Sequence, residues 1–274
     1  MLLGIDIGGT TISLGLVEGY GIVKQNRVPS FEKDATLEET IGYLCGQIEA
    51  IITPEVTHIG VGVPTLVDVK KGIVYDAANI KSWKKVPLKD ILEDRFKVPV
   101  SVNNDANCFV LGAASKVDGD HEVIVGVTLG TGTGIGIVAG GKLVCGDNCG
   151  AGEIGSVPYN GSIFEAFCSK QFFTGRGLDP RETAKAAEAG NPAALALFDE
   201  FGMHLGELLS LVMYSYDPGC VVFGGGVANS FELFKKSMET ALRNRYPYGH
   251  ALDRLVIKAM PQEEIAVIGA SLLS

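Results

Sequence analysis

The sequence contains two copies of a glycine- and threonine-rich turn, and this duplication constrains the fold more than any other feature. The turns Gly8-Gly9-Thr10-Thr11 and Gly130-Thr131-Gly132-Thr133 align at an offset of about 122 residues. An apolar stretch enters and another leaves each turn; the four stretches are residues 2–7, 12–17, 123–129 and 135–139. Short apolar segments joined by a glycine-containing turn are typical of β-hairpins. We therefore predict two related hairpins.

Helix and strand patterns alternate through the rest of the chain. Residues 58–63 and 220–223 have the length and apolar character of buried strands, whereas residues 37–52 show the spacing of an amphipathic helix. Such alternation predicts an α/β fold with mainly parallel sheets, whose ligands bind at the carboxyl ends of the strands. The glycine clusters of this chain lie at such ends.

The length and composition predict two domains. A chain of 274 residues with 46% hydrophobic content can bury a large core, and two domains suit it better than one. We place the first, smaller domain at residues 1–117, with the C-terminal helix at 262–274 packing back on it. The second, larger domain covers residues 118–261.

The charge balance argues against several classes of partner. The net charge is −9, whereas nonspecific binding to nucleic acid or to an anionic membrane requires a concentrated basic face. The uncharged residues 123–141 hold seven glycines, which disfavours the helix that a bilayer would require. Residues 1–6 lack the basic start of a secretory signal, so we expect a cytoplasmic protein.

The two duplicated turns are suited to holding phosphate groups. Glycine permits the close approach by which several backbone N–H groups face one anion, and the threonines add hydroxyls. An ordinary hairpin turn is the alternative for a single copy, but two facing copies predict a clamp on ATP. Neither copy continues into the Gly-Lys-Ser/Thr of a P-loop. The predicted nucleotide-binding residues of these turns are Gly8, Gly9, Thr10, Thr11, Gly130, Thr131, Gly132 and Thr133.

A third glycine cluster, Gly224-Gly225-Gly226, follows a buried strand and precedes a helix. Three successive glycines allow a flat aromatic group or a phosphate to lie against the backbone. Close packing of the strand against the helix is the alternative. We include these three residues in the predicted nucleotide site.

Carboxylates and amides occupy the other strand ends. Asp6 precedes the first turn, where Mg²⁺ or its water would need a carboxylate; bonding the turn itself is the alternative. Asp105 begins a predicted helix, where it could accept the proton of an attacking hydroxyl, although Asn104 and Asp105 also suit a helix cap. With Glu153 and Glu165, these acceptors would fit a ligand rich in hydroxyl donors, such as a sugar.

The combination of motifs resembles the ROK family, which groups bacterial sugar kinases and sugar-responsive repressors on the actin-like ATPase fold. In chain order the motifs are Asp6-Ile7-Gly8-Gly9-Thr10, Asn104-Asp105-Ala106-Asn107, Gly130-Thr131-Gly132-Thr133-Gly134, Gly150-Ala151-Gly152-Glu153-Ile154-Gly155 and Gly224-Gly225-Gly226-Val227. The resemblance implies two RNase H-like domains that close on a hexose and ATP-Mg²⁺, the ion held by Asp6 through water. It implies Asp105 as the general base for the 6-hydroxyl and places the Gly224 run beside the adenosine. It also implies four residues that hold sugar hydroxyls: Asn79, Asn104, Glu153 and Glu165.

The chain departs from the family pattern at the position that follows Gly-Glu-Ile-Gly. Many members have a histidine there that binds both sugar and zinc, followed by a cysteine cluster, whereas this chain has Ser156 and no such cluster. We therefore expect no structural zinc. A metal site formed by Cys145, Cys149 and Cys168 is the less favoured alternative, because their spacing matches no tight metal-binding module.

We therefore predict an ATP-dependent hexose kinase that phosphorylates the 6-hydroxyl. Glucose is the leading substrate, and N-acetylmannosamine, N-acetylglucosamine, allose and fructose are the alternatives. A sugar-sensing repressor is the main alternative of another class; it is disfavoured because the first hairpin begins at residue 2, leaving no helix-turn-helix segment, and because the chain is acidic. A catalytically idle sugar-binding protein is disfavoured by Asp6 and Asp105. Dimers are common in the family, so a homodimer is one expectation.

Overall fold

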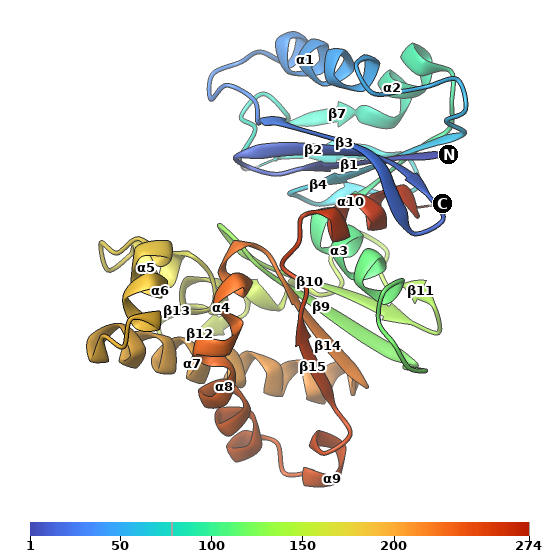
Figure 1. Ribbon diagram of the computed structural model, residues 1–274. Helices are drawn as coiled ribbons and strands as arrows, with labels where there is room; N and C mark the ends of the chain where they lie inside the picture. The colour runs from blue at the N-terminus through green and yellow to red at the C-terminus, as the bar shows by residue number, and fades with distance from the viewer. Residues whose placement is uncertain (78, 274) are drawn as a thin grey trace.

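Two five-stranded sheets form the centres of two lobes in the computed structural model, which describes residues 1–77 and 79–273 (Figure 1). The first sheet runs in the order β3 (Gly21–Pro29), β2 (Thr11–Glu18), β1 (Leu2–Ile7), β4 (His58–Val63) and β8 (Val100–Asn104). The second runs in the order β11 (Lys142–Leu143), β10 (Thr133–Ala139), β9 (Val123–Leu129), β14 (Cys220–Gly224) and β15 (Val256–Ala259). In both, an antiparallel meander continues into two parallel strands. The predicted pair of related hairpins is confirmed.

Two helices lie between the sheets and join the lobes. They are α3 (Asp105–Ala114), which follows β8 directly, and α10 (Glu264–Ser271), near the C-terminus (Figure 1). Helix α10 contacts β1, β2 and β4 of the first sheet and also packs against α3, which in turn contacts β9 and β10 of the second. The two sheets are thus coupled through this pair of helices.

Glycines opposite one another in each hairpin give these helices room to approach. The cross-strand pairs are Gly4 with Gly15 and Gly126 with Gly136. A Cβ atom on Gly4 would overlap the backbone oxygen of Val267 in α10, and one on Gly136 would overlap that of Ala106 in α3. Each hairpin therefore has a pair of facing glycines against which a helix packs closely.

The first lobe is completed by two helices and a small sheet. Helix α1 (Leu37–Glu49) begins with a capping box formed by Thr36 and Glu39, and α2 (Leu88–Phe96) precedes β8. The small sheet contains β5 (Val67–Asp68), β6 (Ile73–Tyr75) and β7 (Lys85–Pro87). Trp83 is fully buried and donates its indole N–H to Thr40 Oγ1 at 2.8 Å.

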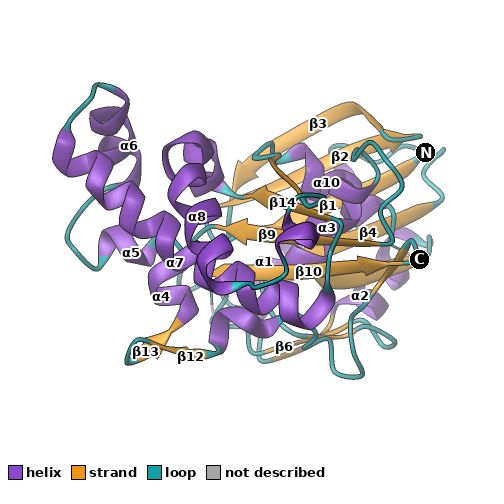
Figure 2. Cartoon of the chain, turned by 90° about the horizontal axis from the view of Figure 1, so that it is seen from below, coloured by secondary structure: helices purple, strands orange, loops and turns teal. Residues whose placement is uncertain are grey.

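The second lobe carries most of the remaining helices on one side of its sheet (Figures 1 and 2). They are α4 (Phe164–Cys168), α5 (Gln171–Thr174), α6 (Pro180–Glu188), α7 (Pro192–Tyr216), α8 (Phe231–Arg245) and α9 (Gly249–Leu252), with 3₁₀ turns η1 (Glu153–Ser156) and η2 (Gly226–Ser230) and the hairpin β12 (Pro158–Tyr159) and β13 (Ser162–Ile163). Helices α6 and α7 are separate, because Gly190 adopts a φ of 82° and Asn191 caps α7. Within residues 1–77 and 79–273, no helix is both long and apolar enough to cross a membrane.

We propose that the domain boundary lies at residues 117 and 118, in the loop between α3 and β9. The packing of α10 on β1 and β4 supports assigning residues 262–274 to the first domain. Helix α3 contacts both lobes, so the boundary follows the chain connection rather than a gap in the packing.

Candidate active site

Asp105 stands where β8 gives way to α3, at the carboxyl edge of the first sheet. The preceding residue, Asn104, caps α3: its side-chain oxygen accepts the N–H groups of Ala106 at 2.9 Å and Asn107 at 3.4 Å. Its amide nitrogen donates to the Thr65 oxygen at 3.3 Å. The helix-cap reading is thus correct for Asn104. Asp105, by contrast, receives no hydrogen bond from any described side chain; its Oδ1 accepts the Ala106 N–H at 2.8 Å.

Asp6 lies at the same edge of the sheet as Asp105. In the sheet register, Gly62 of β4 pairs with Asp6 on one side and with Asn103 on the other. A Cβ atom on Gly62 would lie 3.5 Å from Asp6 Oδ1 and 3.1 Å from the thiol of Cys108 in α3. A side chain at Gly62 would therefore crowd Cys108, and glycine lets Asp6 and the first turns of α3 lie this close together.

The carboxylates predicted for the site influence one another. Burial raises the pKa of Asp6 to about 7, with further contributions from the negative charges of Asp105 and Glu263. Burial also raises the pKa of Asp105 to about 6, against the opposing effect of backbone hydrogen bonds, and Glu153 adds to the increase. No described Lys, Arg or His forms an ion pair with Asp6 or Asp105. Unpaired, partly desolvated carboxylates of this kind are typical of functional sites.

Glu153 extends this group of carboxylates toward Glu165. It begins the 3₁₀ turn η1 and is solvent-accessible, but the protein around it partly desolvates the carboxylate and raises its pKa, with Glu165 contributing next. Electrostatic coupling therefore links Asp6 to Asp105, Asp105 to Glu153 and Glu153 to Glu165. The fold brings together four carboxylates that are far apart in the sequence.

The first glycine turn presents unused backbone donors. Its closing hydrogen bond runs from Gly8 N–H to the Thr11 oxygen at 2.9 Å, and the Ser30 hydroxyl donates to the Gly8 oxygen at 2.8 Å. Gly9 and Thr10 are exposed, and their N–H groups meet no acceptor within residues 1–77 and 79–273. The side chain of Asn79 lies over this turn, 3.3 Å from where a Cβ atom on Gly9 would be. The turn can therefore offer N–H groups to an anion.

The second turn is one residue shorter but also leaves backbone donors unused. Gly130 N–H donates to the Gly132 oxygen at 2.9 Å, and the N–H groups of Thr131 and Gly132 have no acceptor in the described part of the chain. A Cβ atom on Gly130 would meet nothing within 4 Å, so open space borders this turn. The residues of both turns fit a polyphosphate.

Glu165 is engaged with the second turn. Its Oε2 accepts the Thr133 N–H at 3.0 Å, and its Oε1 accepts Gln171 Nε2 at 2.9 Å. Gln171 Nε2 also lies 3.3 Å from the Thr131 oxygen, to which it can donate. Sequence reasoning missed Gln171, because a contact across 40 residues leaves no local pattern. Glu165 thus braces the second phosphate turn in addition to lying beside Glu153.

The third glycine cluster divides into two parts. A Cβ atom on Gly224 would overlap the ring of Phe109, and Gly225 combines a φ of 82° with close approach to the Leu129 oxygen. Close packing therefore accounts for these two glycines. Gly226 has nothing within 4 Å of its Cβ position, so it borders open space.

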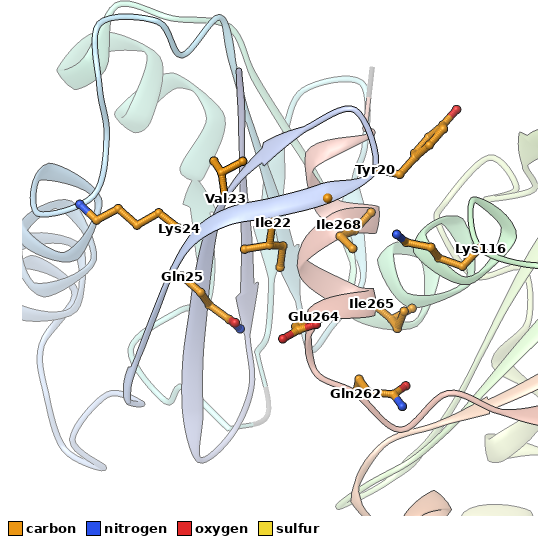
Figure 3. Close-up of a pocket in the computed structure, with 11 residues that line it drawn as sticks. Tyr20, Ile22, Val23, Lys24, Gln25, Lys116, Gln262, Glu264, Ile265 and Ile268 are labelled. Atoms are coloured by element: carbon orange, nitrogen blue, oxygen red, sulfur yellow. The ribbon is translucent and has the colours of Figure 1, made fainter.

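A separate groove lies between β3 and α10, away from this cluster. Ile22 of β3, Glu264 and Ile268 of α10, and Lys116 line it, as Figure 3 shows. None of the predicted site residues is among the described residues that line the groove. It is therefore not the candidate active site.

Within residues 1–77 and 79–273, no three His, Cys, Asp or Glu side chains converge as a metal site would require. Cys168 is fully buried, whereas Cys145 and Cys149 contact the amides of Asn103 and Asn107. The expectation that the protein holds no structural zinc remains a prediction.

The raised pKa values lead to a stability prediction. Because the folded-state pKa values of Asp6 and Asp105 exceed those of the unfolded chain, their ionisation destabilises the folded protein as pH rises from about 4 to 7. We expect Asp6→Asn or Asp105→Asn to raise the free energy of unfolding by roughly 1 to 3 kcal/mol at pH 8 and to have little effect at pH 4. Urea denaturation at the two pH values measures this, with the exposed Asp118→Asn as the control. Destabilisation by both variants at pH 8 would contradict the assigned direction.

Comparison with known proteins identifies the family. A family model described as "ROK family" matches residues 2–274. The chain belongs to the ROK family. The predictions of the family, of two RNase H-like domains and of a sugar kinase are confirmed.

Two curated relatives and one solved structure illustrate the similarity of this ROK protein to others. A glucokinase from Halalkalibacterium halodurans is 30% identical over 278 residues, covering 86% of this chain and 83% of the relative. An N-acetyl-D-glucosamine kinase from Vibrio parahaemolyticus is 30% identical over 303 residues, covering 100% and 99%. A ROK family glucokinase from Streptomyces griseus, in complex with glucose and AMPPNP, is 27% identical with a TM-score of 0.83, covering 100% of this chain and 98% of that one.

Proposed function

We propose that this ROK protein transfers the γ-phosphoryl group of ATP to the 6-hydroxyl of a hexose, with glucose as the leading substrate. The observation that carries the proposal is the position of Asp105: an unpaired, half-buried carboxylate at a helix start, electrostatically coupled to Asp6 on one side and Glu153 on the other. The relatives named glucokinase support the choice of sugar.

Asp105 acts as the general base in this proposal. A carboxylate with a pKa near 6 is mostly ionised at neutral pH and is a better proton acceptor than an ordinary aspartate. Phosphoryl transfer through a loose transition state requires orientation of the attacking hydroxyl more than a strong base. Asp105 would hold the 6-hydroxyl and accept its proton as the bond to phosphorus forms.

The phosphates of ATP would lie against the free N–H groups of the two turns. The nucleotide-binding residues are Gly8, Gly9, Thr10, Thr11, Gly130, Thr131, Gly132 and Thr133, with Gly224, Gly225 and Gly226 beside the adenosine. Four N–H groups, two in each turn, meet no acceptor among the described residues and support this assignment. Of the third cluster, Gly226 has the open surroundings that a ligand needs.

Asp6 is the residue that would hold Mg²⁺, through a water molecule. Its unpaired carboxylate is a hard oxygen donor with a pKa raised by burial and by neighbouring acids, so a cation would relieve the repulsion there. When bound, the ion would neutralise charge on the phosphates.

The sugar would be held by Asn79, Asn104, Glu153 and Glu165. Glu153 and Glu165 can accept hydrogen bonds from hydroxyls, and Glu165 would couple the sugar to the second phosphate turn through Thr133. The Asn104 side-chain oxygen caps α3, so Asn104 would contact the sugar through its amide nitrogen. A cytoplasmic location and a homodimer complete the proposal.

An ATP-coupled assay across a hexose panel tests this function. With Mg²⁺ and ATP, we expect the highest kcat/KM for glucose among glucose, N-acetylglucosamine, N-acetylmannosamine, allose and fructose, and ³¹P NMR should show a 6-phosphate. The matched control is 6-deoxyglucose, which lacks the acceptor hydroxyl and should not react. A higher kcat/KM for another sugar would replace glucose in the proposal. Sugar binding with no turnover of any hexose would favour the sensor alternative.

A further inference from the structure

Two cysteines lie beside the carboxyl edge of the first sheet without a role in the proposed reaction. Cys145 and Cys149 belong to the loop that follows β11 and leads to Glu153; both are free thiols. Cys145 is half-buried, whereas Cys149 is only 3% exposed and packs with the core of the first lobe. The three residues between them, 146–148, are exposed, so this short loop can adjust its shape.

Both sulfur atoms lie against the amides of Asn103 and Asn107. Cys145 Sγ is 3.5 Å from Asn103 Nδ2 and 3.8 Å from Asn107 Nδ2, and the latter is also 3.7 Å from Cys149 Sγ. The Cys149 thiol donates to Asn103 Oδ1 at 3.4 Å. The two thiols therefore lie on the same pair of amide side chains, those of Asn103 and Asn107.

These surroundings give the two thiols different reactivities. The neighbouring Cys149 thiol, followed by the hydrogen bond from Asn103, lowers the pKa of Cys145 to about 6 despite partial burial. The pKa of Cys149 is raised, first by the neighbouring Cys145 and then by burial. Burial raises the pKa of every other cysteine, namely Cys45, Cys108, Cys168 and Cys220. Cys145 is thus an accessible thiolate beside a protonated partner.

We propose that Cys145 and Cys149 form a thiol-modification site that reacts with low-molecular-weight organic disulfides and closes into an intramolecular disulfide. In the first step, the Cys145 thiolate attacks one sulfur of the organic disulfide, forming a mixed disulfide and releasing one thiolate. In the second, the Cys149 sulfur attacks Cys145 Sγ, its proton passes to the released thiolate, and a second thiolate leaves. The two protein thiols are oxidised and the organic disulfide is reduced to two thiol molecules.

Oxidation of the two cysteines would affect the residues around Asp105 through Asn103. Asn103 Oδ1 accepts the Asn104 N–H at 2.8 Å and Asn107 Nδ2 at 2.9 Å, in addition to the Cys149 thiol. Disulfide formation removes that thiol donor and draws Cys149 from its packing beside the residues that present Asp105. We therefore expect oxidation to lower turnover several-fold and a dithiol reductant to restore it.

Incubation with oxidised glutathione, followed by intact mass and peptide mapping, tests the site without relying on kinase activity. Wild-type protein should lose two hydrogen atoms, with Cys145 linked to Cys149 and with Cys45, Cys168 and Cys220 unmodified. Cys149→Ser should instead accumulate one glutathione adduct on Cys145, and Cys145→Ser should leave Cys149 unmodified. Near-wild-type circular dichroism of the variants establishes that they are folded; Cys149→Ala replaces Cys149→Ser if the latter is not.

Three outcomes would overturn the inference. They are a stable glutathione adduct on wild-type Cys145 without closure, modification of Cys149 in Cys145→Ser at the wild-type rate, and equal modification of the buried cysteines. Each of these is read from mass alone. Failure of the hexose assay would therefore leave this test intact, and the two proposals fail separately.

Discussion

Asp105→Asn is expected to lower kcat by about a thousandfold, within the range for loss of a general base. Asparagine preserves the shape of the side chain and its bond to the Ala106 N–H, but it cannot accept the proton of the attacking hydroxyl. KM for the sugar should change much less, because the amide oxygen still accepts a hydrogen bond. Steady-state kinetics with the preferred hexose at saturating ATP measures the effect.

The stability of Asp105→Asn distinguishes a loss of catalysis from a loss of folded protein. The exposed Asp118→Asn removes the same charge elsewhere and should retain wild-type kcat. Because Asp105→Asn is expected to be more stable than wild type at pH 8, a large loss of kcat there could not be attributed to unfolding. A kcat within threefold of wild type would remove Asp105 as the base.

Gly60→Ala is expected to destabilise the protein by roughly 2 to 4 kcal/mol, a large effect for the addition of one methyl group. Gly60 lies in β4 directly beneath α10, and a Cβ atom there would overlap the Ala270 oxygen. The obstacle is backbone and not a flexible side chain, so α10 itself would have to move. Because α10 also packs on α3, a displacement of α10 would extend to α3, which begins at Asp105.

A glycine with free surroundings supplies the control for Gly60. Gly46 is exposed in α1, and its Cβ position has nothing within 4 Å. Gly46→Ala should therefore stabilise the protein by about 0.5 to 1 kcal/mol through helix propensity. Urea denaturation of the two variants measures both changes. If Gly60→Ala proved as stable as wild type, the close packing of α10 on β4 would be incorrect.

The main elements of the fold were predictable because their apolar patterns are long and regular. Strands at residues 2–7, 58–63 and 123–129 have the predicted bounds. The duplication was informative for a physical reason: each hairpin needs cross-strand glycines to seat a helix and a glycine turn at its end. The sequence contained that requirement twice.

The parts that sequence did not predict depend on tertiary structure or are too short to show a period. Strands β5, β6 and β7 have two or three residues each, and α4 and α5 have five and four. The break between α6 and α7, by contrast, has local sequence signals, because Gly190 and Asn191 are ordinary residues for a helix end and a cap.

The candidate active site was also only partly predictable from the sequence. The motif residues Asp6, Asp105 and Glu153 could be chosen from the sequence because each lies beside a glycine-rich segment or at a predicted helix start. The hydrogen bonds from Gln171 to Glu165 and to the second turn could not be predicted, since they depend on segments that only the fold brings together.

A crystal structure with glucose and a nonhydrolysable ATP analogue tests the central claim most directly. The account predicts that an Asp105 carboxylate oxygen lies about 2.6 to 3.2 Å from the 6-hydroxyl, with the phosphates against the free N–H groups of both glycine turns. A complex in which Asp105 faces solvent, with the nucleotide bound away from both turns, would contradict it.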